Sequence, residues 1–350
     1  MVYVIILTWN GKKYLPKLFE SLAVLNYPKD NYKVLVLDSG STDGSLEFLE
    51  KLEKEEKIQL VKLQKNLGFC GGNNIGMERA LKEGAKYIVL LNQDTLVEPN
   101  FLGELVKTAE TNVESGVVQA LILHYKEPQK IQTWGNDLHY LGFGWSGGNW
   151  TKLKNAGANI AEDKKIPYAS GAAVLYKTEM LKKVGLFDEN YFSYHEDSDL
   201  SLRAKLAGYM VILSPQAIVY HDYDFPTDKN KLRYFWNEKN RLYLILKFYR
   251  PKTLFLLLLM MIVMDLGQLV FAIKKGYVRE WLKARFWFIL HGRKLWKVRK
   301  SVQVGRKITD KELTQDFSSE IKYQSVSNFL LERIGNPIMK CYWWVVKKII

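Results

Sequence analysis

The sequence is poor in the residues that form disulfides or bind transition metals. Only two of its 350 residues are cysteine, Cys70 and Cys341, and five are histidine. Neither cysteine belongs to a CxxC pair or has the spacing of a metal ligand, which excludes a disulfide framework and argues against a zinc cluster. Two isolated thiols fit a reducing compartment.

The N-terminus also lacks the features of a targeting segment. The first ten residues have neither the basic region nor the small-residue cleavage site of a signal peptide. The apolar run from Val2 to Leu7 is too short to cross a bilayer. We therefore expect this run to form a buried strand.

Acidic residues are scarce near the C-terminal third, where the positive charge is concentrated. The formal charge is +14, and residues 274–300 hold ten Lys or Arg against one acid, Glu280, a local charge of +9. Such a segment binds nucleic acid or an anionic membrane. Interleaved aromatic residues such as Trp281 and Trp296, and the apolar run directly before the segment, favour an anionic membrane surface and no nucleic-acid partner.

Apolar runs and helical periods alternate along the first hundred residues. Hydrophobic residues make up 47% of the chain, which supports one large domain or two small ones. Continuous apolar strands alternating with helices predict an α/β fold with a mostly parallel sheet flanked by helices. The predicted strands are 2–7, 34–37, 58–63 and 87–91, and the predicted helices are 14–25, 45–56 and 75–83.

Each predicted strand ends in a polar or glycine-rich loop, at the edge of the sheet where open α/β folds bind ligands. Asp38 is placed to accept a hydrogen bond from a nucleotide base, or else it forms an Asx turn. The glycines of the loop 68–72 let backbone N–H groups bind phosphate oxygens. Asp94 is suited to a divalent cation bridging two phosphates, with a simple turn as the alternative.

A second carboxylate cluster lies at Glu196, Asp197 and Asp199. Apolar residues at helical spacing follow it, and Gly208 is a helix stop, so Glu196 and Asp197 begin a predicted helix. Free N–H groups at a helix start keep a carboxylate ionised, and an ionised, positioned carboxylate is what a general base requires. Ordinary helix capping is the alternative.

Seven short segments occur in an order that resembles a known family. The chain is similar to family 2 glycosyltransferases, which have a Rossmann-like GT-A fold, and most resembles their rhamnosyltransferase-like members. The resemblance covers about residues 1–245. The matching segments are 6–10 (ILTWN), 37–45 (LDSGSTDGS), 66–76 (NLGFCGGNNIG), 90–95 (LLNQDT), 170–173 (SGAA), 184–189 (VGLFDE) and 192–200 (FSYHEDSDL).

The resemblance implies a role for each matching residue. Asp197, beside Glu196, matches the base that deprotonates the acceptor hydroxyl. Asp94 matches the end of a DxD-type motif that holds Mg²⁺ or Mn²⁺, although the first position here is Asn92. His221 matches a histidine that joins the metal shell in some relatives, with a structural histidine as the alternative. The implied nucleotide-sugar-binding residues are Thr8, Asn10, Asp38, Gly68, Asn73, Asn92, Gln93, Ser170 and Gly171.

The implied reaction is a metal-assisted, inverting sugar transfer. The donor is a nucleotide-diphosphate sugar, for which the rhamnosyltransferase-like resemblance implies rhamnose, and the acceptor is a hydroxyl of a lipid-linked or cell-surface glycan. One alternative is a processive polysaccharide synthase of the same fold, although such enzymes carry a Gln-x-x-Arg-Trp motif that this chain lacks. Another is a non-catalytic membrane-bound scaffold or nucleic-acid binder, which the basic segment supports.

We expect a catalytic domain at 1–225, divided into a nucleotide-sugar half at about 1–110 and an acceptor half at about 111–225. The least regular part is 115–168, whose Trp- and Gly-rich segment 134–150 suits either a platform for sugar rings or a loop packed on the sheet. A helical region follows at 226–300, with a helix over 229–250, and an amphipathic tail at 301–350.

The apolar segment 254–273 within that helical region is long enough to span a bilayer, at about 1.5 Å per residue. Asp265 interrupts it, and basic residues flank both of its ends, which opposes a simple crossing. We expect a helix that lies in the interface or re-enters at the cytoplasmic face of the cell membrane, so the protein is peripheral, re-entrant or single-pass. A buried core helix is the alternative.

Overall fold

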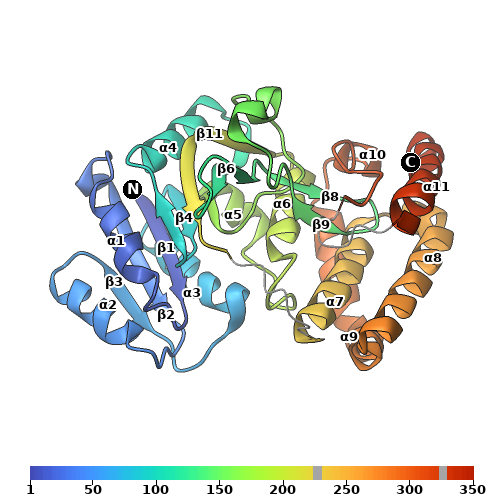
Figure 1. The fold of residues 1–350 in the computed structure, drawn as a ribbon, viewed down its shortest axis with the longest axis horizontal. Coiled ribbons are helices and arrows are strands. Elements are labelled where there is room, and N and C mark those ends of the chain that lie inside the picture. The colour runs from blue at the N-terminus through green and yellow to red at the C-terminus, as the bar shows by residue number, and fades with distance from the viewer. Residues whose placement is uncertain (224–230, 323–328) are drawn as a thin grey trace. The chain divides into compact units, whose positions relative to one another are not determined.

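We describe a computed structural model of the chain, over residues 1–223, 231–322 and 329–350 (Figure 1). The chain divides into two compact units, which are described separately. Unit 1 comprises Met1–Asn136, Ser146–Ala204 and Gly208–Asp224, and unit 2 comprises Asp137–Trp145, Lys205–Ala207 and Phe225–Ile350. The domain boundary expected at 225/226 lies outside the described residues.

Unit 1 contains a sheet of nine strands among its described residues, in the order β3-β2-β1-β4-β10-β6-β11-β5 with β7 beside β6. β10 is antiparallel to both neighbours, so β6 and β11 run in the same direction as β1 to β4. β5 and β7 are antiparallel to their partners as well, so six of the nine strands share one direction in a mixed sheet, and the predicted parallel order holds for β1 to β4. The strands are β1 (Val2–Thr8), β2 (Tyr32–Asp38), β3 (Gln59–Lys62), β4 (Tyr87–Leu91), β5 (Thr95–Val97), β6 (Ser115–His124), β7 (Ile131–Thr133), β10 (Ala173–Lys177) and β11 (Met210–His221).

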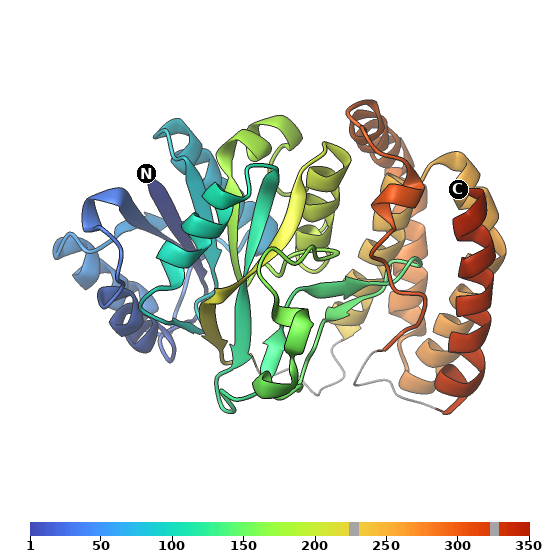
Figure 2. The ribbon, with the colours of Figure 1, turned by 90° about the horizontal axis from the view of Figure 1, so that it is seen from above.

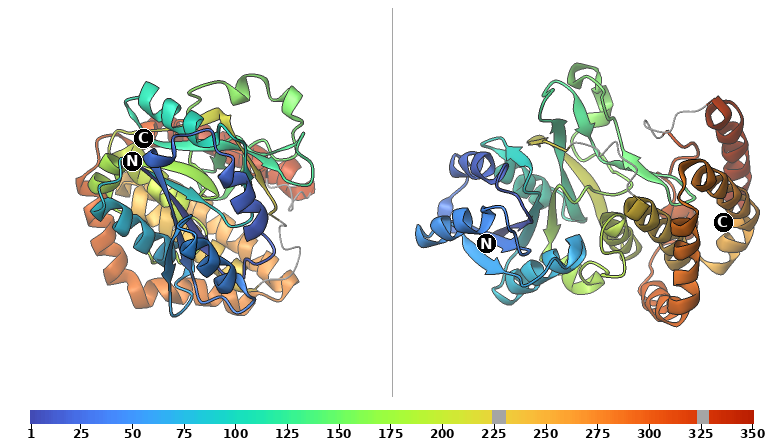
Figure 3. Two further views of the ribbon diagram at one scale, coloured as in Figure 1. Left: turned by 90° about the vertical axis from the view of Figure 1, so that its left-hand side faces the viewer. Right: turned by 60° about the horizontal axis from the view of Figure 1, so that its bottom comes forward.

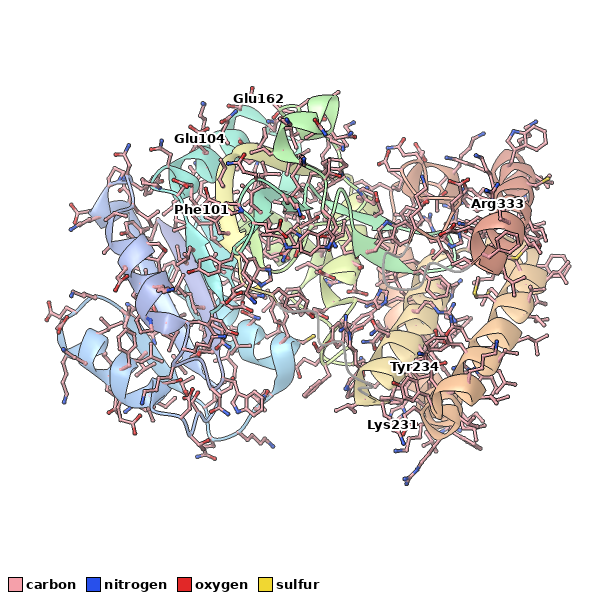
Figure 4. All side chains as sticks on the ribbon, viewed as in Figure 1. Phe101, Glu104, Glu162, Lys231, Tyr234 and Arg333 are labelled. Carbon is pink, nitrogen blue, oxygen red and sulfur yellow. The ribbon has the colours of Figure 1, made fainter. Side chains whose placement is uncertain are left out.

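Helices cover both faces of this sheet, which explains why its strands read as continuous apolar runs. Val4 and Ile6 of β1 pack with α1 and α4 in one core, which includes the fully buried Phe101 labelled in Figure 4. Ile5 and Leu7 face α3 on the other side. The helices are α1 (Leu15–Ala23), α2 (Ser45–Lys54), α3 (Gly68–Lys82), α4 (Phe101–Thr111), α5 (Thr178–Val184) and α6 (Glu196–Leu206).

The prediction that 68–72 forms a loop before a helix at 75–83 was wrong, because α3 begins at Gly68. The glycines permit close packing of this helix on the sheet. A Cβ at Gly72 would lie 2.4 Å from Leu7 Cδ1, and one at Gly76 would lie 2.8 Å from Leu37 Cδ1. Glycine in a helix usually indicates a break, and here tertiary packing outweighs that preference.

The prediction that 115–168 is the least regular part was wrong at its start. Residues 115–124 form β6, a fully buried strand of ten residues between β10 and β11. Gln119 interrupts its apolar run, but the Gln119 Oε1 accepts a hydrogen bond from Ser170 N at 2.7 Å. A polar side chain is tolerated in the core when it is paired in this way.

Unit 2 is mainly helical, and Figures 2 and 3 show its long helices, coloured orange to red, beside one another. Its helices are α7 (Lys231–Phe248), α8 (Pro251–Lys275), α9 (Val278–Val304), α10 (Asp310–Leu313), a π-helical turn (Leu331–Gly335) and α11 (Asn336–Ile349). Pro251 occupies the first turn of α8, and Gly276, at φ 72°, ends it. Residues 229 and 230 of the predicted helix 229–250, and residues 323–328 of the expected amphipathic tail 301–350, lie outside the described residues.

Part of the Trp- and Gly-rich segment folds with these helices. The hairpin strands β8 (Asn136–Leu138) and β9 (Gly144–Ser146) enclose a turn that belongs to unit 2. The Tyr140 ring stacks on Trp343 of α11 with centroids 4.5 Å apart, and its hydroxyl donates to Met339 O. Arg241 of α7 donates to Leu141 O at 3.1 Å. Residues 137–145 are thus neither a loop packed on the sheet nor an open sugar platform.

Candidate active site

Three loops at the carboxyl ends of β1, β2 and β4 are joined by hydrogen bonds. Thr8 pairs in register with Asp38 at the ends of β1 and β2. Gln93, just after β4, accepts hydrogen bonds at its Oε1 from the Thr8 hydroxyl at 2.6 Å and from Trp9 N at 3.0 Å. The structure therefore brings together three of the predicted nucleotide-sugar-binding residues.

Asn10 connects the β1 loop to the β2 loop. Its Oδ1 accepts from Thr42 N, and its own N–H donates to the Ser41 hydroxyl, each at 2.9 Å. Asn10 has φ 51°, a left-handed conformation that asparagine tolerates better than most residues. These bonds fix the backbone on both sides of the expected nucleotide pocket.

Asp38 is buried, and its carboxylate accepts from Ser41 N at 2.9 and 3.2 Å. This is the Asx-type turn that the sequence left open as an alternative. A carboxylate has about four acceptor positions, so the turn leaves others for a base N–H. Recognition of a base by Asp38 stays a prediction.

Asp94 and His221 meet at the next strand ends. The Asp94 Oδ1 lies 3.1 Å from His221 Nε2, and His221 Nδ1 lies 2.7 Å from Gln132 Oε1. As the Gln132 amide is placed, its oxygen accepts from Nδ1–H, so Nε2 presents a lone pair to Asp94 unless the ring is protonated or a cation lies between them. The Asp94 oxygen and the His221 nitrogen are both ligands that Mn²⁺ accepts, whereas Mg²⁺ prefers oxygen ligands and would bind mainly to Asp94.

Within the described ranges, no group of three or more His, Cys, Asp or Glu side chains gathers where it could hold a metal ion. Asp94 and His221 are therefore at most two ligands of a metal. A cation here would need further oxygens from a diphosphate and from water, which is common for Mg²⁺. The residues present thus fit an ion that binds together with a nucleotide diphosphate.

Asp197 reaches the same region from the start of α6. Asn92 N donates to Ala172 O at 2.9 Å, and the neighbouring Gly171 N makes a long hydrogen bond of 3.4 Å to Asp197 Oδ2. Asp197 Oδ1 also accepts from Ser198 N at 2.7 Å. These bonds join the end of β4 at Asn92, the residues just before β10 at Gly171, and the start of α6 at Asp197.

The helix start does not lower the pKa of either Glu196 or Asp197 below its usual range. Burial raises the pKa of Asp197 to about 6, despite hydrogen bonds from Ser198 and Gly171 that lower it. Burial, followed by the negative charge of Asp197, raises the pKa of Glu196 well above its usual range. Among the described residues, none forms a hydrogen bond with Glu196 Oε2. The loss of hydration outweighs the N–H groups of the helix.

Gly68 and Asn73 both belong to α3, and Gly68 lies against the loop that precedes α6. Gly68 has φ 74°, and a Cβ there would lie 2.7 Å from Phe192 Cδ2. The Gly68 N–H already donates to Asn66 Oδ1, and the Asn73 side chain donates to Phe69 O within its own helix. Gly68 therefore contacts the loop before α6, while the Asn73 side chain bonds within α3 and the binding of phosphate by either residue stays a prediction.

Two residues that position α6 were missed at the sequence level. Arg203 Nε donates to Asp199 Oδ2 at 2.6 Å, and its other nitrogens donate to the carbonyls of Val184, Gly185 and Leu186. Tyr191 donates to the other oxygen of Asp199 at 3.1 Å. The i, i+4 spacing of Asp199 and Arg203 was the signal that could have identified the pair.

Several bacterial glycosyltransferases are similar to this chain. "Poly(ribitol-phosphate) beta-N-acetylglucosaminyltransferase TarS" of Staphylococcus aureus (strain Mu50 / ATCC 700699) is 24% identical over 220 residues, 62% of this chain and 35% of TarS. The "N-acetylglucosaminyl-diphospho-decaprenol L-rhamnosyltransferase" of Mycobacterium tuberculosis (strain ATCC 25618 / H37Rv) is 25% identical over 62% of this chain and 75% of its own length. "Rhamnosyltransferase WbbL" of Escherichia coli (strain K12) is 27% identical over 64% and 85%. The chain thus spans about a third of TarS and most of the two rhamnosyltransferases.

Solved structures confirm the GT-A fold. GalNAc-T7 with UDP, GalNAc and Mn²⁺ aligns with a TM-score of 0.59 at 16% identity, covering 72% of this chain and 48% of that one. The mannosyltransferase PcManGT of Pyrobaculum calidifontis, with GDP-Man and Mn²⁺, aligns with 0.52 at 15% identity, covering 99% and 86%. The family model described as Glycosyl transferase family 2 matches residues 3–185, more than half of the 350 residues. The chain belongs to glycosyl transferase family 2.

Proposed function

We propose that this chain is an inverting glycosyltransferase that moves a sugar from a nucleotide-diphosphate donor to a hydroxyl of a lipid-linked or cell-surface glycan. The observation that supports this most is a continuous set of contacts at one edge of the sheet. It runs from Asp38 through Thr8 and Gln93 to the loop of Asp94, and from that loop through Gly171 to Asp197. Base recognition, metal binding and proton removal need such proximity.

The donor nucleotide would lie against Thr8, Asn10 and Asp38. The relative TarS has been solved as a fragment in complex with UDP-GlcNAc. Two relatives of which this chain covers three quarters or more are named rhamnosyltransferases. Rhamnose is therefore the donor sugar that we would test first, and N-acetylglucosamine the second.

Asp94 and His221 would hold Mg²⁺ or Mn²⁺ on the diphosphate. A divalent ion at this place supplies positive charge that stabilises the leaving nucleotide diphosphate. His221 is held toward Asp94 by Gln132, which fixes the direction of its Nε2. Asn92 contributes no charge, so Asp94 is the anionic ligand of the motif.

Asp197 would take the proton of the attacking hydroxyl, and one displacement at the anomeric carbon inverts its configuration. With its pKa raised to about 6, Asp197 is ionised at pH 7 and is a stronger base than an exposed aspartate. We expect kcat/KM to fall as the pH drops below about 6, because protonated Asp197 accepts no proton. The hydrogen bonds from Gly171 and Ser198 orient its oxygens.

The acceptor would be carried on a membrane lipid, as the name of the mycobacterial relative indicates for that enzyme. We accordingly propose that the protein works at the cytoplasmic face of the cell membrane. The catalytic domain would correspond to 1–225, and the helical region with the tail 301–350 would serve attachment. The single helix among the described residues that is long and apolar enough to cross a membrane is α8.

The test begins with a thermal-shift screen of nucleotide sugars in Mn²⁺, followed by transfer assays with the donor that binds. Asp197→Asn should bind that donor as well as the wild type but lose transfer by about a thousandfold or more, since base catalysis and its charge are both removed. NMR of the product should show inversion. Transfer by Asp197→Asn at the wild-type rate, or a product of retained configuration, would overturn the proposal.

A further inference from the structure

The outward side of α8 is an uninterrupted apolar stripe. Between residues 255 and 273 the exposed positions recur with the period of the helix. Each of them except Gly267 carries a large hydrophobic side chain. The stripe extends for about 27 Å at 1.5 Å per residue. Its members, which we call the α8 stripe, are Phe255, Leu258, Leu259, Ile262, Val263, Leu266, Val270 and Ile273.

This stripe does not belong to a core helix. Only 11% of the most apolar window of α8 is buried, and Phe255 is 76% exposed. Contiguous apolar surface of this kind marks a protein or membrane contact. The question is which partner the rest of unit 2 favours.

The two polar residues in the middle of α8, Asp265 and Gln268, contact the neighbouring helices. Asp265 forms an ion pair with Arg285 of α9, whose Nε lies 3.1 Å from the carboxylate, and Arg285 also bonds Glu238 of α7 at 2.9 Å. Tyr234 of α7, labelled in Figure 4, donates to Gln268 O at 3.2 Å. The charge of Asp265, which interrupts the apolar segment in the sequence, is therefore neutralised by Arg285 of α9.

These same contacts oppose a crossing of the bilayer by α8. α9 follows α8 after a tight turn at Gly276 and remains tied to it by the Asp265–Arg285 pair. The exposed side of α9 carries six basic residues, each costing about 3 kcal/mol at the centre of a bilayer, so α9 cannot accompany α8 across. They are Arg279, Lys283, Arg293, Lys294, Lys297 and Lys300.

The apolar surface continues onto α11 and is bounded by positive charge. Tyr342 of α11 donates to Leu256 O, and Lys252 donates to Ile349 O at 2.8 Å, so α11 lies beside the first half of α8. The outward side of α11 presents Trp344, which is 61% exposed. Exposed basic residues stand at both ends of α8, namely Arg250, Lys252, Lys274 and Lys275. Apolar surface with a cationic border matches an anionic bilayer.

We propose that the outward faces of α8 and α11 form an in-plane docking surface for a bilayer of anionic phospholipid, immersed in one leaflet. The proposal rests on the membrane location given under the proposed function, and it specifies which surface binds the membrane. Its evidence comes from the contacts and exposed residues of α8, α9 and α11. The apolar stripe enters the leaflet, and the basic residues of α9 and of the α8 ends stay at the phosphate level.

The chain supplies its own probe for this surface. Cys341 on α11 is exposed and Cys70 is buried, so an environment-sensitive maleimide dye labels position 341 selectively. With vesicles of phosphatidylglycerol and phosphatidylcholine, the dye should shift to the blue. Spin-labelled lipids with shallow labels should quench it more than mid-bilayer labels. Vesicles of phosphatidylcholine alone should bind about a thousandfold more weakly, because each of the four basic residues at the ends of α8 contributes roughly 1 kcal/mol.

A matched pair of variants separates this surface from general hydrophobicity. Leu259 on the stripe and Val24 in unit 1 are both 62% exposed. Leu259→Glu should weaken vesicle binding by about tenfold or more, and Val24→Glu should leave it unchanged. Both variants should keep the thermal shift caused by nucleotide sugar, so loss of membrane binding is distinguished from failure of the donor site.

Three results would overturn the proposal. One is equal binding of the wild type and Leu259→Glu to anionic vesicles. Another is strongest quenching by mid-bilayer labels, which would indicate a spanning helix. The third is a lipid-free dimer, measured by light scattering, that Leu259→Glu dissociates, because a second copy would then cover the stripe.

Discussion

Asparagine at position 197 removes a charge that the folded protein holds in an unfavourable environment. Burial moves the pKa of Asp197 from 3.8 to about 6. At pH 8 this corresponds to a cost of about 3 kcal/mol in the free energy of unfolding for a fully buried group. The Asp197 side chain keeps part of its surface exposed to water, so we expect about 1–2 kcal/mol. Asp197→Asn should therefore be more stable than the wild type while being inactive.

The pH dependence of this gain follows from the direction of the shift. Since the folded pKa lies above the unfolded one, the carboxyl favours the folded state below pH 3.8, and that contribution is lost as the pH rises through about 6. Asp197→Asn should raise Tm by about 2–6 °C at pH 8 and by little at pH 4. Differential scanning fluorimetry of both proteins measures this, with Asp30→Asn at an exposed site as the control. A gain that is absent at pH 8, or equal at pH 4 and pH 8, would refute the burial argument.

Three further substitutions test other parts of the structure. Gly72→Val should lower the free energy of unfolding by about 2–3 kcal/mol in urea titrations, because its Cβ would lie 2.4 Å from Leu7 Cδ1; wild-type stability would contradict the packing of α3. Arg203→Gln should lower the free energy of unfolding by about 3–5 kcal/mol, because it leaves the carboxylate of Asp199 buried opposite a neutral side chain. Adding Asp199→Asn to this variant should restore part of the lost stability. No restoration would mean that the two residues do not interact energetically. Trp150 is half-exposed and stacks on His124, with ring centroids 4.0 Å apart, next to the strand of His221. If it contacts the acceptor, as we propose, Trp150→Ala should raise KM for the acceptor about tenfold without changing donor binding. An equal loss of donor affinity would refute this role.

The sequence predicted the elements whose signal is local. Apolar runs identified β1, β2 and β4, and the polar residues after them were expected to meet because parallel strands end at one edge. The contacts of Asn92 with Ala172 and of Gly171 with Asp197 are findings of the structure, because the order of the matching segments along the chain does not specify them. The predicted parallel direction of β1, β2 and β4 was also confirmed, because helices connect these strands.

What the sequence did not predict depends on tertiary contacts. Gly68 begins a helix because the glycines of α3 pack on β1, which no helix propensity reveals. The interior position of Gln119 depends on its bond to Ser170 N, 51 residues away. The pKa of Asp197 rises because of burial, whereas the sequence contains only the helix start that lowers it. Residues 137–145 join unit 2 through Tyr140 and Trp343, far apart in the chain.

In the proposed mechanism Asp94 and Asp197 act at one donor site, where Asp94 holds the metal ion and Asp197 takes the proton of the acceptor. The most direct measurement is calorimetric titration of the nucleotide sugar selected by the thermal-shift screen, with Mn²⁺ and with EDTA, into wild type, Asp94→Ala and Asp197→Asn. We predict that Mn²⁺ strengthens donor binding to wild type and to Asp197→Asn alike, and that Asp94→Ala loses this dependence. Donor binding by Asp94→Ala that Mn²⁺ still strengthens to the wild-type extent would contradict the account.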